Sequence, residues 1–212
     1  MKQKQIRTIV TLVGLYVICQ AIADVGATKI VQVGSITMPA GTFIFALTFT
    51  VRDMIHKRLG KAWARTAIFA AGAFNVLQAV YLALMGLMPS PVFFGLGDAW
   101  NSIFALVPAI TAGSIVAEVL SEWIDTEIYQ VVKARTAWPQ WTRVLLSNAV
   151  SLPLDSFVFG MLAFVVLPPI LGGHAMPFAA AMGVAFGQVV FKAVVTVVSL
   201  PGIYLVKDEQ AI

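Results

Sequence analysis

Long apolar runs joined by short polar connections constrain the fold of this chain more than any other feature of its sequence. Six runs can be traced, at about 8–23, 39–53, 63–88, 103–125, 144–167 and 176–205. A helix needs about 20 apolar residues to cross the hydrocarbon core of a bilayer. Of the 212 residues, 59% are hydrophobic and only 11% are charged. We therefore predict an all-α, polytopic integral membrane protein with six transmembrane helices in a single domain, 1–212.

The basic residues predict the orientation of these helices, because cytoplasmic connections of membrane proteins are enriched in Lys and Arg. With both termini cytoplasmic, the inner segments hold 12 of the 14 basic residues: Lys2, Lys4, Arg7, Arg52, Lys57, Arg58, Lys61, Arg65, Lys133, Arg135, Arg143 and Lys207. This bias predicts a multi-pass protein of the cell (inner) membrane. Lys192 falls within the last predicted span and needs a carboxylate partner there, for which Asp155 and Glu118 are the candidates.

Three N-terminal features allow more than one interpretation. The residues before Asp24 resemble a signal-peptidase site, but the rest of the chain is equally apolar, so we interpret the first run as an uncleaved span. The stretch from Val25 to Pro39 is predicted to be an outer connection or a short re-entrant piece. The second run is short and ends at Arg52 and Asp53, which we interpret as a charged pair at a helix end. Alternatively, that helix carries both residues partway into the bundle.

Two polar stripes run through the fourth and fifth spans at helical spacing. The first contains Glu118, Glu122, Asp125 and Tyr129, and the second contains Asn148, Ser151, Asp155 and Phe159. Ionisable groups inside a membrane are costly, so these stripes are candidates for a functional site. The fourth helix begins either at Ser102 or at Pro108, and this choice decides how deep its acids lie.

Neutral amides and a lysine add to the polar positions within the spans. Asn75 and Gln78 lie on one side of the third span and are either contacts between helices or substrate contacts. Gln188 and Lys192 lie one turn apart near the middle of the sixth span. We include all four in the candidate substrate-binding set.

The two polar stripes share a short repeated motif. Ser121 and Asp125 are spaced as Ser151 and Asp155 are, thirty residues later. On successive helices the two copies would run in opposite directions and meet near one site, as repeats do in many transporters. With four matched positions, a chance resemblance is the alternative.

The sequence also argues against several other classes of protein. It contains no Gly-rich phosphate-binding loop, no Cys/His cluster for a metal, and only two distant histidines. We therefore expect no cofactor, no metal site and no enzymatic activity. The basic isoelectric point, near 9.4, follows from the cytoplasmic connections, so nucleic acid is not expected as a partner.

Three blocks of the sequence resemble the queuosine precursor transporter family, also called the vitamin uptake transporter family. They are the segment from Gly41 to Asp53 that leads to Leu59-Gly60, the segment from Ala117-Glu118 to Tyr129, and the segment from Ser147-Asn148 to Phe159. Many members have Pro where this chain has Ala46, which leaves open whether the second helix breaks there.

The resemblance implies a six-helix importer of 7-deazaguanine precursors of queuosine, such as 7-cyano-7-deazaguanine, without an ATPase of its own. It also implies a fold similar to the substrate-binding subunits of energy-coupling-factor transporters. The alternative functions are a ligand-binding membrane subunit that needs a separate energising ATPase, and a membrane enzyme. Proton coupling and facilitated diffusion both remain open, and a homodimer is possible.

The chemistry of such a base suggests roles for the candidate residues. The base offers two adjacent N–H donors, a carbonyl acceptor and two π faces. We expect Asp155 or Glu118 to accept from the donor edge, and Lys192 to balance the carboxylate. Asn148 and Gln188 would contact the other polar atoms, and Phe159 or Tyr129 would stack on the ring. The alternative is that these side chains only pack helices together.

Overall fold

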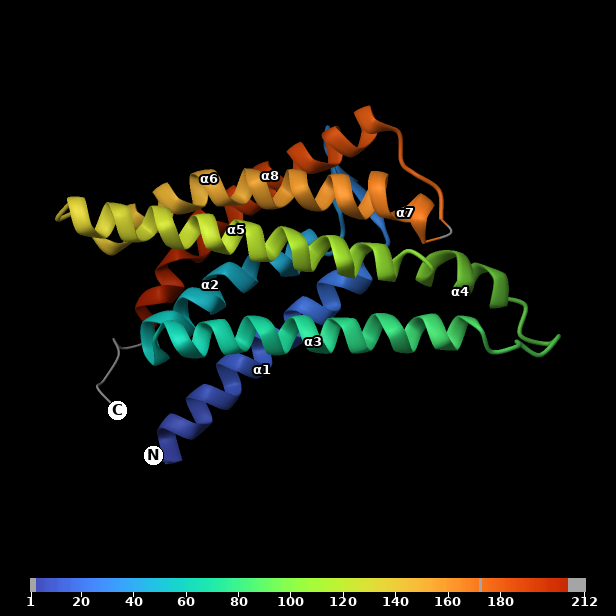
Figure 1. Cartoon of the computed structure of the whole chain (residues 1–212), viewed down its shortest axis with the longest axis horizontal. Helices are drawn as coiled ribbons and strands as arrows, with labels where there is room; N and C mark the ends of the chain where they lie inside the picture. Colours follow the sequence, from blue (N-terminus) through green and yellow to red (C-terminus); the bar gives the residue numbers. More distant parts are fainter. Residues whose placement is uncertain (1–2, 172, 206–212) are drawn as a thin grey trace.

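The protein is a bundle of long helices with one small β-hairpin at its edge (Figure 1). A computed structural model describes residues 3–171 and 173–205. The long helices are α1 (Gln3–Gly26), α2 (Thr42–Leu59), α3 (Lys61–Gly86), α5 (Val107–Arg135), α6 (Gln140–Met161) and α8 (Phe178–Ser199). The shorter elements are β1 (Ile30–Val33), β2 (Ile36–Pro39), α4 (Gly97–Phe104), the π-helix η1 (Leu162–Val166), α7 (Leu167–Ile170) and the 3-10 helix η2 (Leu200–Leu205). The predicted helical class is confirmed, with the hairpin as its only exception among the described residues.

Five stretches of the described chain are long and apolar enough to cross a membrane. They are Ile6–Gly26, Ala62–Gly86, Gly97–Val132, Trp141–Ile170 and Phe178–Ser199. Large apolar side chains on their outer faces, such as Phe69, Leu77, Phe186 and Val198, remain exposed, as contact with lipid requires. The prediction of a multi-pass membrane protein is therefore confirmed. The second predicted span, 39–53, corresponds to α2, which has four charged residues within its 18 and does not meet the same criterion, so a count of six is not confirmed.

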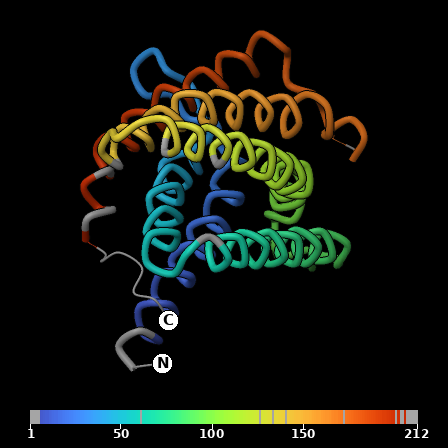
Figure 2. The backbone as a smooth tube through the Cα atoms, turned by 60° about the vertical axis from the view of Figure 1, so that its left-hand side comes forward, coloured from blue at the N-terminus to red at the C-terminus, as the bar shows by residue number. Residues whose placement is uncertain are grey.

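The helices surround α2. In both views α5 and α6 lie side by side, and α2 lies between this pair and α3 (Figures 1 and 2). Nine residues of α2 are buried: Thr42, Ala46, Thr48, Phe49, Thr50, Val51, Arg52, Ile55 and Leu59. The start of α1, the α2–α3 turn and the α5–α6 connection lie at one end of the molecule (Figure 1). We call this the terminal end, and the opposite end, which carries the β-hairpin, the hairpin end.

The stretch from Val25 to Pro39 folds into the hairpin, where the sequence predicted an outer connection or a re-entrant piece. Strands β1 and β2 pair antiparallel from Ile30 with Pro39 to Val33 with Ile36. Gly34 takes a positive φ of 63° in the turn, a conformation that glycine adopts at little cost. Strand β2 packs on α8, and Met38 is buried there. The hairpin is therefore part of the packed bundle.

Helix boundaries differ from the expected ones in the region of the acids. Of the two proposed starts for the fourth helix, the structure has the later one, since α5 begins at Val107 with Pro108 in its first turn. The helix continues to Arg135, well past the predicted end at 125, because the basic segment that follows is also helical. Helix α2 runs without a break through Ala46, where many relatives were expected to have proline.

The contact between the hairpin and α8 yields a test of this fold. A Cβ at Gly187 would overlap the carbonyl oxygen of Thr37, whereas a Cβ at Gly183, one turn earlier, would make only an ordinary 3.9 Å contact. We expect Gly187→Ala to destabilise the protein by about 1–3 kcal/mol, as overpacking does. Gly183→Ala should be neutral or stabilising, because alanine favours helix. Thermal unfolding of both purified variants in detergent measures the difference, and equal melting temperatures would contradict the packing.

Candidate functional site

Arg52 of α2 forms an ion cluster with the acidic stripe of α5. Its guanidinium contacts Glu122 and lies 3.5 Å from the carboxylates of Asp125 and Asp53. Arg52 is only 8% exposed, so these carboxylates compensate its charge inside the bundle. Of the two interpretations of Arg52 and Asp53, the structure has the second: α2 continues to Leu59 and carries both residues into the bundle, so they do not lie at a helix end. The two side chains do pair with each other.

Lys192 of α8 forms a second buried ion pair. Its Nζ donates to Asp155 Oδ2 of α6 at 2.6 Å and to Ser156 Oγ at 3.3 Å, and both charged side chains are 1% exposed. The ammonium also lies 4.7 Å from the centroid of the Phe45 ring, within the range of a cation–π contact. Asp155 is thus the partner that a lysine within a membrane span requires.

Helices α5 and α6 are cross-linked by a reciprocal pair of hydrogen bonds. Ser121 Oγ of α5 donates to Asp155 Oδ1 of α6 at 3.3 Å, and Ser151 Oγ of α6 donates to Asp125 Oδ1 of α5 at 3.1 Å. These four residues are the serines and aspartates of the repeated motif seen in the sequence. Each aspartate therefore accepts from the serine of the other helix and, through its second oxygen, pairs with a cation, Arg52 or Lys192.

Several predicted site residues lie outside these ion pairs. Glu118 accepts hydrogen bonds from Tyr16 and from Gln20 Nε2, at 2.7 Å in the second case, and so joins α5 to α1. Asn148 is buried, and neither atom of its amide group has a hydrogen-bond partner. Asn75 and Gln78 lie on α3, and Tyr129 lies near the C-terminus of α5. No group of His, Cys, Asp or Glu side chains in the described part of the chain is arranged to hold a metal ion.

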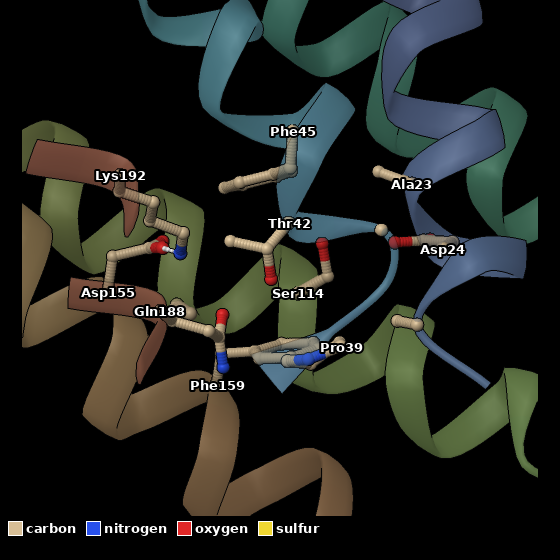
Figure 3. Close-up of a pocket in the computed structure, with 13 residues that line it drawn as sticks. Ala23, Asp24, Pro39, Thr42, Phe45, Ser114, Asp155, Phe159, Gln188 and Lys192 are labelled. Carbon is tan, nitrogen blue, oxygen red and sulfur yellow. Dashed lines mark hydrogen bonds and ion pairs between the residues drawn. The ribbon is translucent and has the colours of Figure 1, made fainter. Parts of the chain in front are cut away.

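A pocket with an empty volume of about 340 Å³ lies within the bundle (Figure 3). Five helices and strand β2 contribute its walls: Ala23, Asp24, Ala27, Pro39, Gly41, Thr42, Phe45, Ser114, Ala117, Asp155, Phe159, Gln188 and Lys192.

The structure brings four predicted residues together at the pocket: Asp155, Phe159, Gln188 and Lys192. The amide nitrogen of Gln188 has no hydrogen-bond partner, although the residue is only 2% exposed. Buried polar groups in native proteins are nearly always satisfied, so this donor is available to a bound molecule. The remaining members of the predicted set, Asn148, Glu118, Glu122, Asp125, Tyr129, Asn75 and Gln78, do not line the pocket.

Among the lining residues with polar or aromatic side chains, sequence reasoning missed four: Asp24, Thr42, Phe45 and Ser114. Ser114 lies four residues before Glu118, so the polar stripe of α5 begins one helical turn earlier than the sequence analysis predicted. Asp24 is an acid near the end of an apolar span and was interpreted only as the residue after a possible cleavage site. Thr42 and Phe45 lie in an apolar run that gives no comparable signal.

The pocket offers a varied set of contacts on opposing walls. Figure 3 shows the Lys192–Asp155 pair on one side and Asp24 on the other, with the hydroxyls of Thr42 and Ser114 between them. The rings of Phe45 and Phe159 provide apolar faces. This combination of charged, hydroxyl, amide and aromatic groups suits a flat polar molecule better than an aliphatic one.

The fold and the pocket together define a class: a multi-pass membrane protein with a polar binding pocket inside its helix bundle. The family described as "Putative vitamin uptake transporter" matches residues 39–206, which is most of the chain. The chain belongs to this family of transporters, and the resemblance seen in the sequence is confirmed. The family does not consist of enzymes, which excludes the membrane-enzyme alternative.

A curated relative agrees with this assignment. The "Probable queuosine precursor transporter" of Bacillus subtilis (strain 168) is 26% identical over 163 residues, which cover 74% of this chain and 68% of the relative. No solved structure matches the chain. The expected likeness to energy-coupling-factor subunits therefore stays a prediction.

The Lys192–Asp155 pair makes a testable contribution to stability. Removal of one partner from a buried ion pair leaves an uncompensated charge and typically costs about 3–5 kcal/mol. We expect Lys192→Met to lower the thermal stability of the purified protein strongly. The double variant Lys192→Met/Asp155→Asn removes both charges and should recover most of the loss. A double variant no more stable than Lys192→Met would show that the pairing of the charges is not the cause.

Proposed function

We propose that this protein imports a queuosine precursor, 7-cyano-7-deazaguanine or a related 7-deazaguanine, into the cytoplasm across the cell inner membrane. The observation that carries the proposal is the pocket within the bundle, whose Asp155, Gln188 and Phe159 side chains suit a planar, polar base. The printed name of the Bacillus subtilis relative supports the same substrate class. Transport is proposed to be secondary, without an ATPase in the chain.

The pocket residues match the chemistry of a deazaguanine group by group. The Gln188 amide nitrogen, which lacks a protein partner, would donate to the carbonyl of the base. Phe159, and on the opposite wall Phe45, would contact the π faces. The Lys192–Asp155 ion pair gives the pocket a polar wall that has no net charge. Glu118, Glu122, Asp125, Asn148, Tyr129, Asn75 and Gln78 would then serve helix packing rather than direct binding.

In the proposed orientation both termini lie in the cytoplasm, and α2 crosses the membrane in addition to the five apolar stretches. This orientation is supported by the position of the first turn of α1 and of η2 at the same end of the molecule (Figure 1). The pocket then opens nearer the outer surface, because Thr42 is the first residue of α2 and Asp24 lies two residues before the end of α1.

In the same orientation the Arg52 cluster lies on the cytoplasmic side of the pocket. Ten residues separate Thr42 from Arg52 along α2, which is about 15 Å of helix. The cluster would therefore act as the inner barrier, and its ion pairs would have to separate to release the substrate. Such a barrier is compatible with either proton coupling or facilitated diffusion.

Import is tested in cells that can neither synthesise nor take up the precursor. Expression of this chain should restore queuosine in tRNA when the medium contains a low concentration of 7-cyano-7-deazaguanine. Asp155→Ala should reduce the restored queuosine at least tenfold, because it removes a pocket wall and leaves Lys192 unpaired. Asp98→Asn, on the exposed face of α4, is the matched control and should behave as wild type. An immunoblot of the membrane fraction shows whether each variant is inserted.

Reconstitution separates this proposal from a subunit that needs an energising ATPase. Purified protein in liposomes should move radiolabelled 7-cyano-7-deazaguanine into the lumen without any other protein. Binding without movement would favour the partner-dependent alternative. Uptake that is unaffected by a protonophore in cells would indicate facilitated diffusion rather than proton coupling.

A further inference from the structure

Asp24 is a buried carboxylate in the pocket wall that has no cation partner among the described residues. It is 2% exposed, and its Oδ2 accepts a hydrogen bond from Thr111 Oγ1 at 2.9 Å. The Ser114 hydroxyl also hydrogen bonds with this carboxylate. The ion pairs within residues 3–171 and 173–205 that involve Arg52 and Lys192 do not include it. A carboxylate withdrawn from water needs several hydrogen bonds or a counter-charge to offset its lost hydration. Asp24 is thus only partly compensated by the protein.

The other two acids proposed for the donor edge of the ligand are already engaged. Asp155 accepts from Lys192 through Oδ2 and from Ser121 through Oδ1. Glu118 accepts from Tyr16 and Gln20 and does not line the pocket. A carboxylate has about four lone-pair sites on its two oxygens. Of these three acids, Asp24 is the one that both lines the pocket and has no ion pair among the described residues.

The position of Asp24 suits a contact with the edge of a flat ligand. Its carboxylate lies across the pocket from the Lys192–Asp155 pair, with the Ser114 and Thr42 hydroxyls between them (Figure 3). The aromatic ring of Phe159 lies on another wall. A planar base held against Phe159 can therefore turn one edge toward Asp24 and the opposite edge toward Gln188.

We propose that Asp24 is the specificity-determining residue of this pocket and accepts two adjacent N–H donors of the substrate, a ring N–H and an exocyclic amine. This inference rests on the proposed function and deepens it, because it assigns the guanine-type edge of the base to one carboxylate. Thr111 holds that carboxylate in position from α5. A base that lacks the amine leaves one oxygen of Asp24 without its partner, which penalises binding.

The experiment compares two probes that differ only in the exocyclic amine. They are 7-cyano-7-deazaguanine and its 2-deamino counterpart, 7-cyano-7-deazahypoxanthine. The affinity of each is measured by titration calorimetry on purified wild type, on Asp24→Asn, and on Asp98→Asn as the matched acid-to-amide control. Asparagine keeps the size of the side chain and its bond with Thr111, but it offers one acceptor where aspartate offers two.

We expect wild type and Asp98→Asn to bind the amino-bearing base more tightly by roughly 10- to 100-fold, the effect of one unpaired buried partner. In Asp24→Asn the two affinities should converge to within a few-fold. A preference that survives in Asp24→Asn would overturn the role of Asp24 and leave the import proposal intact. Wild type that binds neither probe would instead contradict the proposed function.

A second variant covers the case in which Asp24→Asn does not fold. Asp24→Ser also removes the acceptor pair, is smaller, and can still hydrogen bond with Thr111. It should lose the same preference between the two probes. The ratio of affinities is the decisive readout, because a purely structural role for Asp24 would weaken the binding of both probes alike.

Discussion

Arg52 and Lys192 each place a positive charge inside an apolar bundle, where an unpaired charge is too costly to retain. Both are compensated by acids of the central helices, Arg52 by Glu122 and Asp125 of α5 and Lys192 by Asp155 of α6. The two pairings fix α2 and α8 to the α5–α6 pair. Without them the Arg52 charge of α2 would lie unpaired in the interior of the bundle.

The register between α5 and α6 follows from the same acids. Each aspartate uses one oxygen for a cation and the other for a serine of the opposite helix, Ser151 for Asp125 and Ser121 for Asp155. A shift of one helix along the other would break both hydrogen bonds at once. The repeated spacing of serine and aspartate in the sequence is therefore explained by one antiparallel contact in which each half completes the other.

The pocket lies where this network leaves hydrogen-bonding groups unused. Close to the ion pairs, Gln188 keeps a free amide nitrogen and Asp24 keeps acceptor capacity. Helix packing offers neither of them a full set of partners. In a family of transporters, such groups around a pocket are what binding of a polar substrate requires. The strand β2, which adds Pro39 to the pocket wall, shows that the hairpin also belongs to the site.

The sequence by itself determined the membrane class, the family and the helical periodicity of the polar stripes, because these depend only on residue type and spacing along the chain. It also predicted that Lys192 needs a carboxylate, since that follows from the cost of a charge in a bilayer. It could not decide which stripe residues face the pocket. Glu118 and Asp155 both look like pocket acids in the sequence. In the structure Glu118 accepts a hydrogen bond from Tyr16, whereas Asp155 lines the pocket. Asp24 lies outside both the resembling blocks and the family match, and only the packing of α1 against α2 and α5 brings it to the pocket. Such placement depends on contacts between residues far apart in the chain, which local patterns do not encode.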